Sequence, residues 1–207
     1  MATPYDVGVF INCPFDARYR KLFRATVFAV SDCGFLPRCA LEAEDGGEER
    51  IRKIKRIIRE CRYGIHDISR VEVDPKSRLP RFNMPLELGL FLGAQEYGVD
   101  EQKEKRSLVL DPVPYRYQKF CSDIAGQDIR AHGNQAVKAV AAVRAMLATA
   151  LGEFRLPGPG RIMERYLAFQ TGLPALCREV GIAPGELQFV ELRTLIRAWI
   201  ANNPIDR

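Results

Sequence analysis

The sequence predicts an α/β domain with a doubly wound parallel sheet, followed by a helical extension. Short apolar segments typical of buried strands alternate with longer segments of helical periodicity through residues 1–155. Such alternation is characteristic of parallel strands connected by helices that cover both faces of the sheet. A segment rich in Pro and Gly at 156–160 separates this part from further helical sequence. We therefore divide the chain into an α/β domain at 1–155 and an extension at 156–207.

The predicted elements follow one another in a regular order. Segment 6–12 is an apolar strand, 17–33 is a helix that Gly34 ends, and 35–41 is a second strand. An acidic loop at 42–47 leads to an amphipathic helix at 50–61 and a third strand at 63–68. A polar loop at 71–80 precedes the next helix, and strands at 107–110 and 128–131 and a helix at 134–151 complete the domain. In the extension we expect helices at 161–171, 173–180 and 186–201.

The helix that begins near Pro85 carries a single carboxylate, Glu87, among apolar residues. Proline suits a first helical turn because its missing N–H has no partner there. Leu86, Leu88 and Leu90 make the helix apolar nearly all round, so we expect it to pack inside a core. A carboxylate in such surroundings is costly to ionise unless it is paired or used in chemistry. Glu87 is therefore the first candidate for a catalytic role.

Composition and charge limit the classes of function. The chain of 207 residues is 47% hydrophobic and has a net charge of +5, which allows an anionic ligand such as a nucleotide but is weak evidence for binding of nucleic acid, which we do not expect as a partner. The basic helix at 50–61 has no interleaved aromatic residues on which bases could stack. The sequence has no apolar run that would cross a membrane and no signal-peptide pattern at its start, so we expect a cytoplasmic protein. Six scattered cysteines and two histidines do not predict a metal site, and we expect no cofactor.

Acidic residues follow the predicted strands at Asp16, Glu42, Asp67 and Asp111. Ligands of open parallel sheets bind beyond the carboxyl ends of the strands, so we expect these acids and Glu87 to surround one crevice. Each of three acids has a structural alternative: Asp16 as a helix cap, Asp111 as a turn residue and Glu42 as a solvated loop residue. Asp67 and Glu87 are the stronger candidates because apolar residues flank both.

Three segments resemble the group of flavodoxin-type domains that contains the nucleoside 2-deoxyribosyltransferases and the TIR domains. Segment 5–12 (YDVGVFIN), followed by Asp16, is similar to the first strand and loop of a TIR domain. Segment 66–69 (HDIS) is similar to the strand-end aspartate of the deoxyribosyltransferases. Segment 85–90 (PLELGL) is similar to their E-L-G helix, which carries the catalytic glutamate. The resemblance extends over about 5–111.

This resemblance implies an N-glycosidase or deoxyribosyltransferase-like enzyme that cleaves the glycosidic bond of NAD or a related nucleotide or nucleoside. Glu87 would form a covalent glycosyl ester or stabilise an oxocarbenium-like transition state, and Asp67 would hydrogen-bond the sugar or the base. Nicotinamide departs as a neutral group and needs no general acid, which favours NAD as substrate. The residues expected to bind substrate are Asn12, Phe15, Asp16, Ser69, Arg81, Phe82 and Asn83.

Two alternatives belong to other classes of function. The domain could bind a nucleotide or a nucleotide-derived signal without cleaving it, and the C-terminal helices would then transmit the occupied state. It could also be a TIR-like interaction module that acts through oligomerisation, and we expect a homo-oligomer. The apolar side chains of the last helix would form the interface in that case, or would instead pack on the sheet. They are Leu192, Leu195, Ile196 and Trp199.

Overall fold

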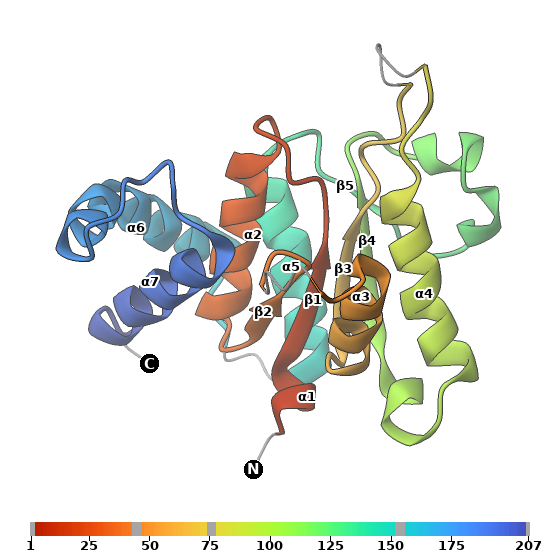
Figure 1. Cartoon of the computed structure of the whole chain (residues 1–207), viewed down its shortest axis with the longest axis horizontal. Coiled ribbons are helices and arrows are strands. Elements are labelled where there is room, and N and C mark those ends of the chain that lie inside the picture. Colours follow the sequence, from red (N-terminus) through yellow and green to blue (C-terminus); the bar gives the residue numbers. More distant parts are fainter. Residues whose placement is uncertain (1–2, 43–46, 74–77, 152–155, 206–207) are drawn as a thin grey trace.

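A computed structural model describes residues 3–42, 47–73, 78–151 and 156–205, which form a parallel sheet covered by helices on both faces (Figure 1). The strands are β1 Gly8–Asn12, β2 Leu36–Arg38, β3 Tyr63–Asp67, β4 Arg106–Asp111 and β5 Arg130–Ala131. Their order across the sheet is β2-β1-β3-β4-β5, with every pair parallel. This is the strand order of flavodoxin-like doubly wound sheets. The predicted fold class is therefore confirmed.

The helices form two layers on one side of the sheet and a single layer on the other. Helices α2 and α5 cover one face, α3 and α4 cover the opposite face, and α6 and α7 pack on the outer side of α2 (Figure 1). None of the helices within the described residues is both long and apolar enough to span a membrane. The α-helices are α1 Pro4–Val7, α2 Arg20–Asp32, α3 Arg50–Arg59, α4 Asn83–Tyr97, α5 Ala136–Leu151, α6 Pro159–Glu179 and α7 Phe189–Asn202. The 3-10 helices are η1 Asp100–Glu104, η2 Arg116–Lys119 and η3 Ser122–Ile124.

Alternation along β1 assigns its side chains to the two faces. Val9 and Ile11 belong to the core formed with α2 and α5, whereas Phe10 packs with α3 and with Phe91 of α4. Because successive strand residues point to opposite faces, Asn12 lies on the same face as Phe10. The end of β1 thus presents a polar side chain to the start of α4.

Gly64 in β3 leaves room for His66 and Phe91. A Cβ atom at residue 64 would lie 2.5 Å from Nε2 of His66 and 2.9 Å from the Phe91 ring. We expect Gly64→Ala to lower the free energy of unfolding by about 1–3 kcal/mol, because overpacking a close-packed core forces neighbouring atoms apart. Urea unfolding measures the change. Gly89→Ala in α4 is the control, since a Cβ there meets no atom within 4 Å, and alanine should stabilise that helix by about 0.5–1 kcal/mol. Equal stabilities of Gly64→Ala and the wild type would contradict the prediction.

The N-terminal elements are shorter than predicted. Segment 6–12 begins with the helical turn α1, because Thr3 and Asp6 form a capping box and Pro4 occupies the first helical position. Helix α2 begins at Arg20 instead of residue 17, and β2 spans three residues of the predicted 35–41. Gly34 ends α2 as predicted, with φ +85° in the left-handed region. Residues 43–46 of the predicted acidic loop lie outside the described residues.

The extension contains fewer and longer helices than predicted. Pro159 and Gly160 belong to the first turn of α6 and not to the linker. The helices predicted at 161–171 and 173–180 are a single helix, with Pro174 in its interior. Phe169, Leu173 and Cys177 are all buried on one face of α6, and this continuous contact offsets the hydrogen bond that Pro174 cannot donate.

Helix α6 and helix α7 pack on α2 through aromatic side chains. The Phe28 ring lies 5.6 Å from the rings of Tyr166 and Phe169 and 5.7 Å from that of Trp199. Leu192 and Ile196 are buried in the same core. Leu192 and Ile196 of the last helix are thus buried, and Leu195 and Trp199 half-buried, in the core that α7 shares with α2 and α6.

Helix α4 has one buried side and one exposed side. Met84, Glu87, Leu88 and Phe91 are buried, whereas Leu86 is 56% exposed. The prediction that this helix packs inside a core was therefore wrong. It covers a face of the sheet as a single outer layer, so its outer side faces away from the sheet (Figure 1). Glu87 lies on the buried side.

Candidate functional site

A cavity of about 260 Å³ opens at the carboxyl ends of β1 and β3. The chain leaves β1 for β2 on one face of the sheet and returns from β2 to β3 on the other, so the strand order reverses between these two strands. This reversal is where open α/β sheets bind their ligands. The lining residues are 12–16, Arg50, Arg70, Arg81, Asn83, Met84 and Glu87.

Three kinds of segment bring these residues together. Residues 12–16 continue directly from β1, and Arg70 lies three residues after the end of β3. Arg50 is the first residue of α3, and Asn83 and Glu87 belong to the first two turns of α4. Parallel strands end at the same edge of a sheet, and the helices that follow begin there. Residues far apart in the sequence therefore share one cavity.

Glu87 is a buried carboxylate without a partner. Its side chain is 6% exposed, and it makes no hydrogen bond or ion pair with any described residue. Burial raises the pKa of Glu87 from its ordinary value of 4.5 to about 7, and the positive charge of Arg50 acts against this rise. Near neutral pH both protonation states of Glu87 are therefore populated, and the ionised fraction is available as a nucleophile or a base.

Asn12 holds the start of α4 against the end of β1. Its Nδ2 atom donates a hydrogen bond to the backbone oxygen of Met84 at 2.8 Å and lies 3.2 Å from Nδ1 of His66. Burial lowers the pKa of His66 to about 3, so its ring is neutral and Nδ1 can accept this second hydrogen bond. The side-chain oxygen of Asn12 has no partner among the described residues. It is left as a hydrogen-bond acceptor in the cavity lining.

Three arginines give the cavity a positive rim. Arg70 binds the Asp16 carboxylate, with Nε 2.8 Å from Oδ2, and this hydrogen bond lowers the pKa of Asp16. Asp16 also accepts the backbone N–H of Tyr19 at 3.0 Å, but Tyr19 itself is the N-cap residue of α2, so the alternative of Asp16 as the helix cap was wrong. Arg50 and Arg81 make no hydrogen bond or ion pair within the described part of the chain. Their charges are available to an anionic ligand.

Asp67 lies on the opposite face of the sheet from Glu87. Its Oδ2 atom accepts a hydrogen bond from Tyr19 Oη at 2.5 Å and lies 3.0 Å from Nε2 of His132. The carboxylate is fully buried and does not line the cavity. Strand alternation explains this placement: His66 points toward α4, so Asp67 must point toward α2 and α5. Asp67 ties together the loops before those two helices.

The other residues predicted to bind substrate divide into two groups. Asn12, Phe15, Asp16, Arg81 and Asn83 line the cavity together with Glu87. Ser69 is fully buried and Phe82 is 56% exposed, and neither lines it.

Sequence reasoning missed the two charged lining residues Arg50 and Arg70. Their positions in the sequence could have predicted them. Each lies where the chain enters a helix or leaves a strand, which in a parallel sheet is the carboxyl edge.

The remaining strand-end acids are paired elsewhere. Asp111 accepts hydrogen bonds from Arg116 at 2.9 Å and from the backbone N–H of Val113 at 3.0 Å, as the turn alternative predicted. Glu42 forms an ion pair with Arg38. The expectation that all five acids surround one crevice was therefore wrong, since only Asp16 and Glu87 line the cavity.

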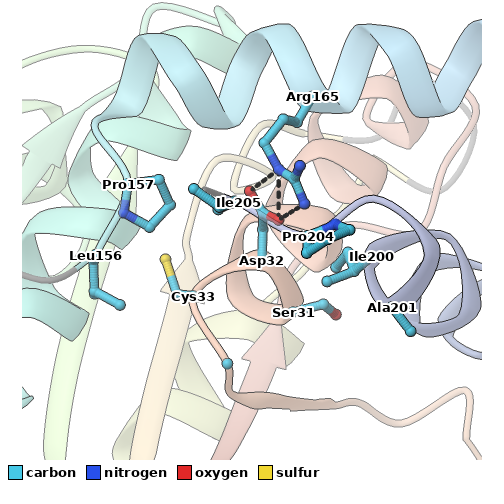
Figure 2. Close-up of a pocket in the computed structure, with 11 residues that line it drawn as sticks. Ser31, Asp32, Cys33, Leu156, Pro157, Arg165, Ile200, Ala201, Pro204 and Ile205 are labelled. Carbon is cyan, nitrogen blue, oxygen red and sulfur yellow. Dashed lines mark hydrogen bonds and ion pairs between the residues drawn. The ribbon is translucent and has the colours of Figure 1, made fainter. Parts of the chain in front are cut away.

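A larger cavity, of about 750 Å³, lies at the far end of α2 beside α6 and the end of α7 (Figure 2). Its two charged residues, Asp32 and Arg165, bind each other and leave no free carboxylate. Burial raises the pKa of its Cys33 thiol to about 12, which keeps the sulfur protonated and unreactive. The cavity of Glu87 is therefore the better candidate for chemistry.

The fold and this cavity define a doubly wound α/β protein with a candidate ligand site at the reversal of strand order. No family model, curated protein or solved structure matches the chain. Within the described residues, no cluster of His, Cys, Asp and Glu side chains is arranged as metal ligands.

Proposed function

We propose that the protein is an N-glycosidase that cleaves the bond between a ribose and its base in NAD or a related nucleotide or nucleoside, with Glu87 as the catalytic residue. The observation that carries the proposal is the position of Glu87: a buried, unpartnered carboxylate that lines a cavity at the reversal of strand order. A buried carboxylate without a partner lowers the stability of the fold. It would also repel an anionic ligand, so anion binding alone does not explain its presence.

The proposed reaction breaks the bond between C1′ of the ribose and the ring nitrogen. The bonding electrons move to the nitrogen, so the positively charged nicotinamide of NAD departs as a neutral molecule. The Glu87 carboxylate either attacks C1′ to form a glycosyl ester or stabilises the positive charge that develops on the ribose. Water then adds to C1′ and loses a proton to the solvent. Where the ester has formed, this water displaces the Glu87 carboxylate as the ester bond to C1′ breaks, so both routes end in hydrolysis with Glu87 regenerated.

The lining residues suit a nucleotide. The free side-chain oxygen of Asn12 can accept a hydrogen bond from a ribose hydroxyl, and Phe15 offers an aromatic ring that is 38% exposed. Arg50 and Arg81 can bind phosphate oxygens. The volume of about 260 Å³ is just below the range of about 300–1,000 Å³ typical of small-molecule sites. It is suited to one nucleoside unit.

Chromatography of reaction mixtures tests the proposal. Purified protein is incubated with NAD, NADP and a panel of nucleosides, next to Glu87→Gln at the same concentration. Release of nicotinamide or a free base by the wild type alone supports an N-glycosidase and identifies its substrate. If every compound is recovered intact while one of them raises the melting temperature, the protein is a nucleotide-binding module and the proposal is wrong.

The pH dependence of the reaction is expected to follow the ionisation of Glu87. Both proposed roles need the carboxylate, whose fraction increases as pH rises through a pKa of about 7. The value of kcat/KM should therefore increase by about tenfold between pH 6 and pH 8, since kcat/KM reports the ionisation of the free enzyme. Initial rates at low substrate concentration across this range measure the profile.

Arg50→Gln provides an internal check on this profile. The positive charge of Arg50 lowers the pKa of Glu87, so its removal should move the midpoint of the profile to higher pH. An activity that falls with pH over the same range would show that the protonated acid is the active form, and would contradict the proposed role.

A further inference from the structure

A second cavity, of about 240 Å³, lies across a short loop from the cavity of Glu87. Pro14, Phe15 and Asp16 line both cavities, so this loop is their common wall. The second cavity is completed by α2 and by the C-terminal segment 185–192, which approaches the start of α2. A ligand bound at Glu87 needs only to pass over this loop to reach it.

The second cavity has aromatic and aliphatic walls. Phe15 packs edge-on against Phe23, with ring centres 5.4 Å apart, and Phe23 lies 6.0 Å from Phe189 of α7. Leu41, Leu187 and Leu192 complete the apolar lining. Such walls favour a flat aromatic group such as a nucleobase. Every nucleobase can stack on aromatic rings, because stacking depends on its flat face and not on the arrangement of its polar atoms.

Basic residues belong to the lining of this second cavity. Arg20 and Arg24 line it, and Arg20 makes no hydrogen bond or ion pair within the described residues. Arg24 donates a hydrogen bond to the backbone oxygen of Pro184 at 3.1 Å and so fixes the C-terminal segment to α2. Arg70 neutralises Asp16, the acid in the shared wall. A negatively charged linker crossing the wall would meet arginines on both sides.

From this arrangement we infer that the second cavity binds the distal base of a dinucleotide whose reacting nucleoside lies at Glu87. The linking diphosphate crosses the loop 14–16 between Arg20 and Arg70. The inference rests on the proposed function, and it specifies the class of substrate as a dinucleotide in preference to a mononucleotide. It also assigns a role to the C-terminal extension, which supplies one wall of the distal site.

Gly185→Trp tests this inference. Gly185 lines the second cavity, and a Cβ there meets no atom within 4 Å, so the indole can occupy the cavity without strain on the backbone. Gly160→Trp in the first turn of α6 is the matched control, because residue 160 is equally open and lines neither cavity. The readouts are kcat/KM for NAD, kcat/KM for nicotinamide mononucleotide, and the affinity for ADP measured by calorimetry.

Gly185→Trp should lower kcat/KM for NAD and the affinity for ADP by at least about tenfold, and change kcat/KM for nicotinamide mononucleotide by less than about twofold. Gly160→Trp should match the wild type. A parallel loss with both substrates, or unchanged binding of ADP, would overturn the inference. If ADP binding is lost in Gly185→Trp but the wild type cleaves neither substrate, the distal site is supported and the proposed glycosidase activity fails.

Discussion

Glu87→Gln is expected to abolish release of the base while making the fold more stable above neutral pH. The amide keeps the shape of the side chain but cannot attack C1′ or balance the charge that develops on the ribose. Loss of a group that acts only in the transition state lowers kcat, and we expect a loss of at least about 10³-fold. Product chromatography measures this loss.

The gain in stability follows from the pKa of Glu87. Burial raises this pKa from 4.5 to about 7, so the folded protein holds a proton that the unfolded chain releases. The contribution of Glu87 to stability is therefore greatest below about pH 4.5 and is lost as pH rises toward 7. Glutamine has no such dependence, so the variant should be more stable than the wild type by about 2–3 kcal/mol near pH 8 and by much less near pH 5.

A control on the same helix separates this effect from a general loss of charge. Glu96 is exposed on α4. Glu96→Gln should leave turnover unchanged and the free energy of unfolding within about 0.5 kcal/mol of the wild type. Urea unfolding of the three proteins near pH 8 and near pH 5 gives the comparison. If Glu87→Gln is inactive and also less stable at both pH values, Glu87 has a structural role, and loss of activity would say nothing about catalysis.

Part of the candidate site was predictable because its residues lie at one edge of the sheet. Asn12 ends an apolar strand, and Glu87 is an isolated carboxylate near the start of a helix. In a parallel sheet both positions are at the carboxyl edge, so the sequence alone could place them together. The buried environment of Glu87 also followed from its apolar neighbours.

Asp67 was misplaced because strand ends identify an edge of the sheet but not a face. His66 and Asp67 are adjacent and must point to opposite faces. The register pairs Asn12 with His66, which places both near α4 and turns Asp67 toward Tyr19 and α2. This choice depends on which helices cover each face, and local sequence does not specify that.

The sequence of α2 contains evidence for the second helical layer, but the prediction of strands and helices did not draw on it. Nearly every residue from Leu22 to Asp32 is buried, although α2 lies on the surface of the sheet. A helix buried on both sides needs a second cover, and α6 and α7 supply it. The apolar residues Phe28 and Ala29 carried this information, but the identity of the covering helices requires tertiary contacts.

Arg165→Met is expected to cause the largest loss of stability, about 3–5 kcal/mol, because it leaves Asp32 buried without a partner. Arg165 extends from α6 to α2, where its Nε and Nη2 atoms lie 3.0 Å and 2.9 Å from Oδ1 of Asp32 (Figure 2). The side chains of Asp32 and Arg165 are 0% and 6% exposed. Water therefore cannot replace the lost guanidinium, and the free energy of unfolding measured in urea should fall accordingly.

Two further variants distinguish the ion pair from the packing of the arginine stem. Arg161→Met, in the first turn of α6, breaks an exposed pair with Glu164 and should change stability by less than about 0.5 kcal/mol. The double variant Asp32→Leu with Arg165→Met removes both charges and should recover most of the loss, since apolar pairs can replace buried ion pairs. Should the double variant be as unstable as Arg165→Met, the arginine would act through its contact with Trp199, 5.2 Å from the guanidinium carbon, and not through its charge. Recovery would instead show that the loss in Arg165→Met comes from the unpaired carboxylate of Asp32 and not from the missing stem of the arginine.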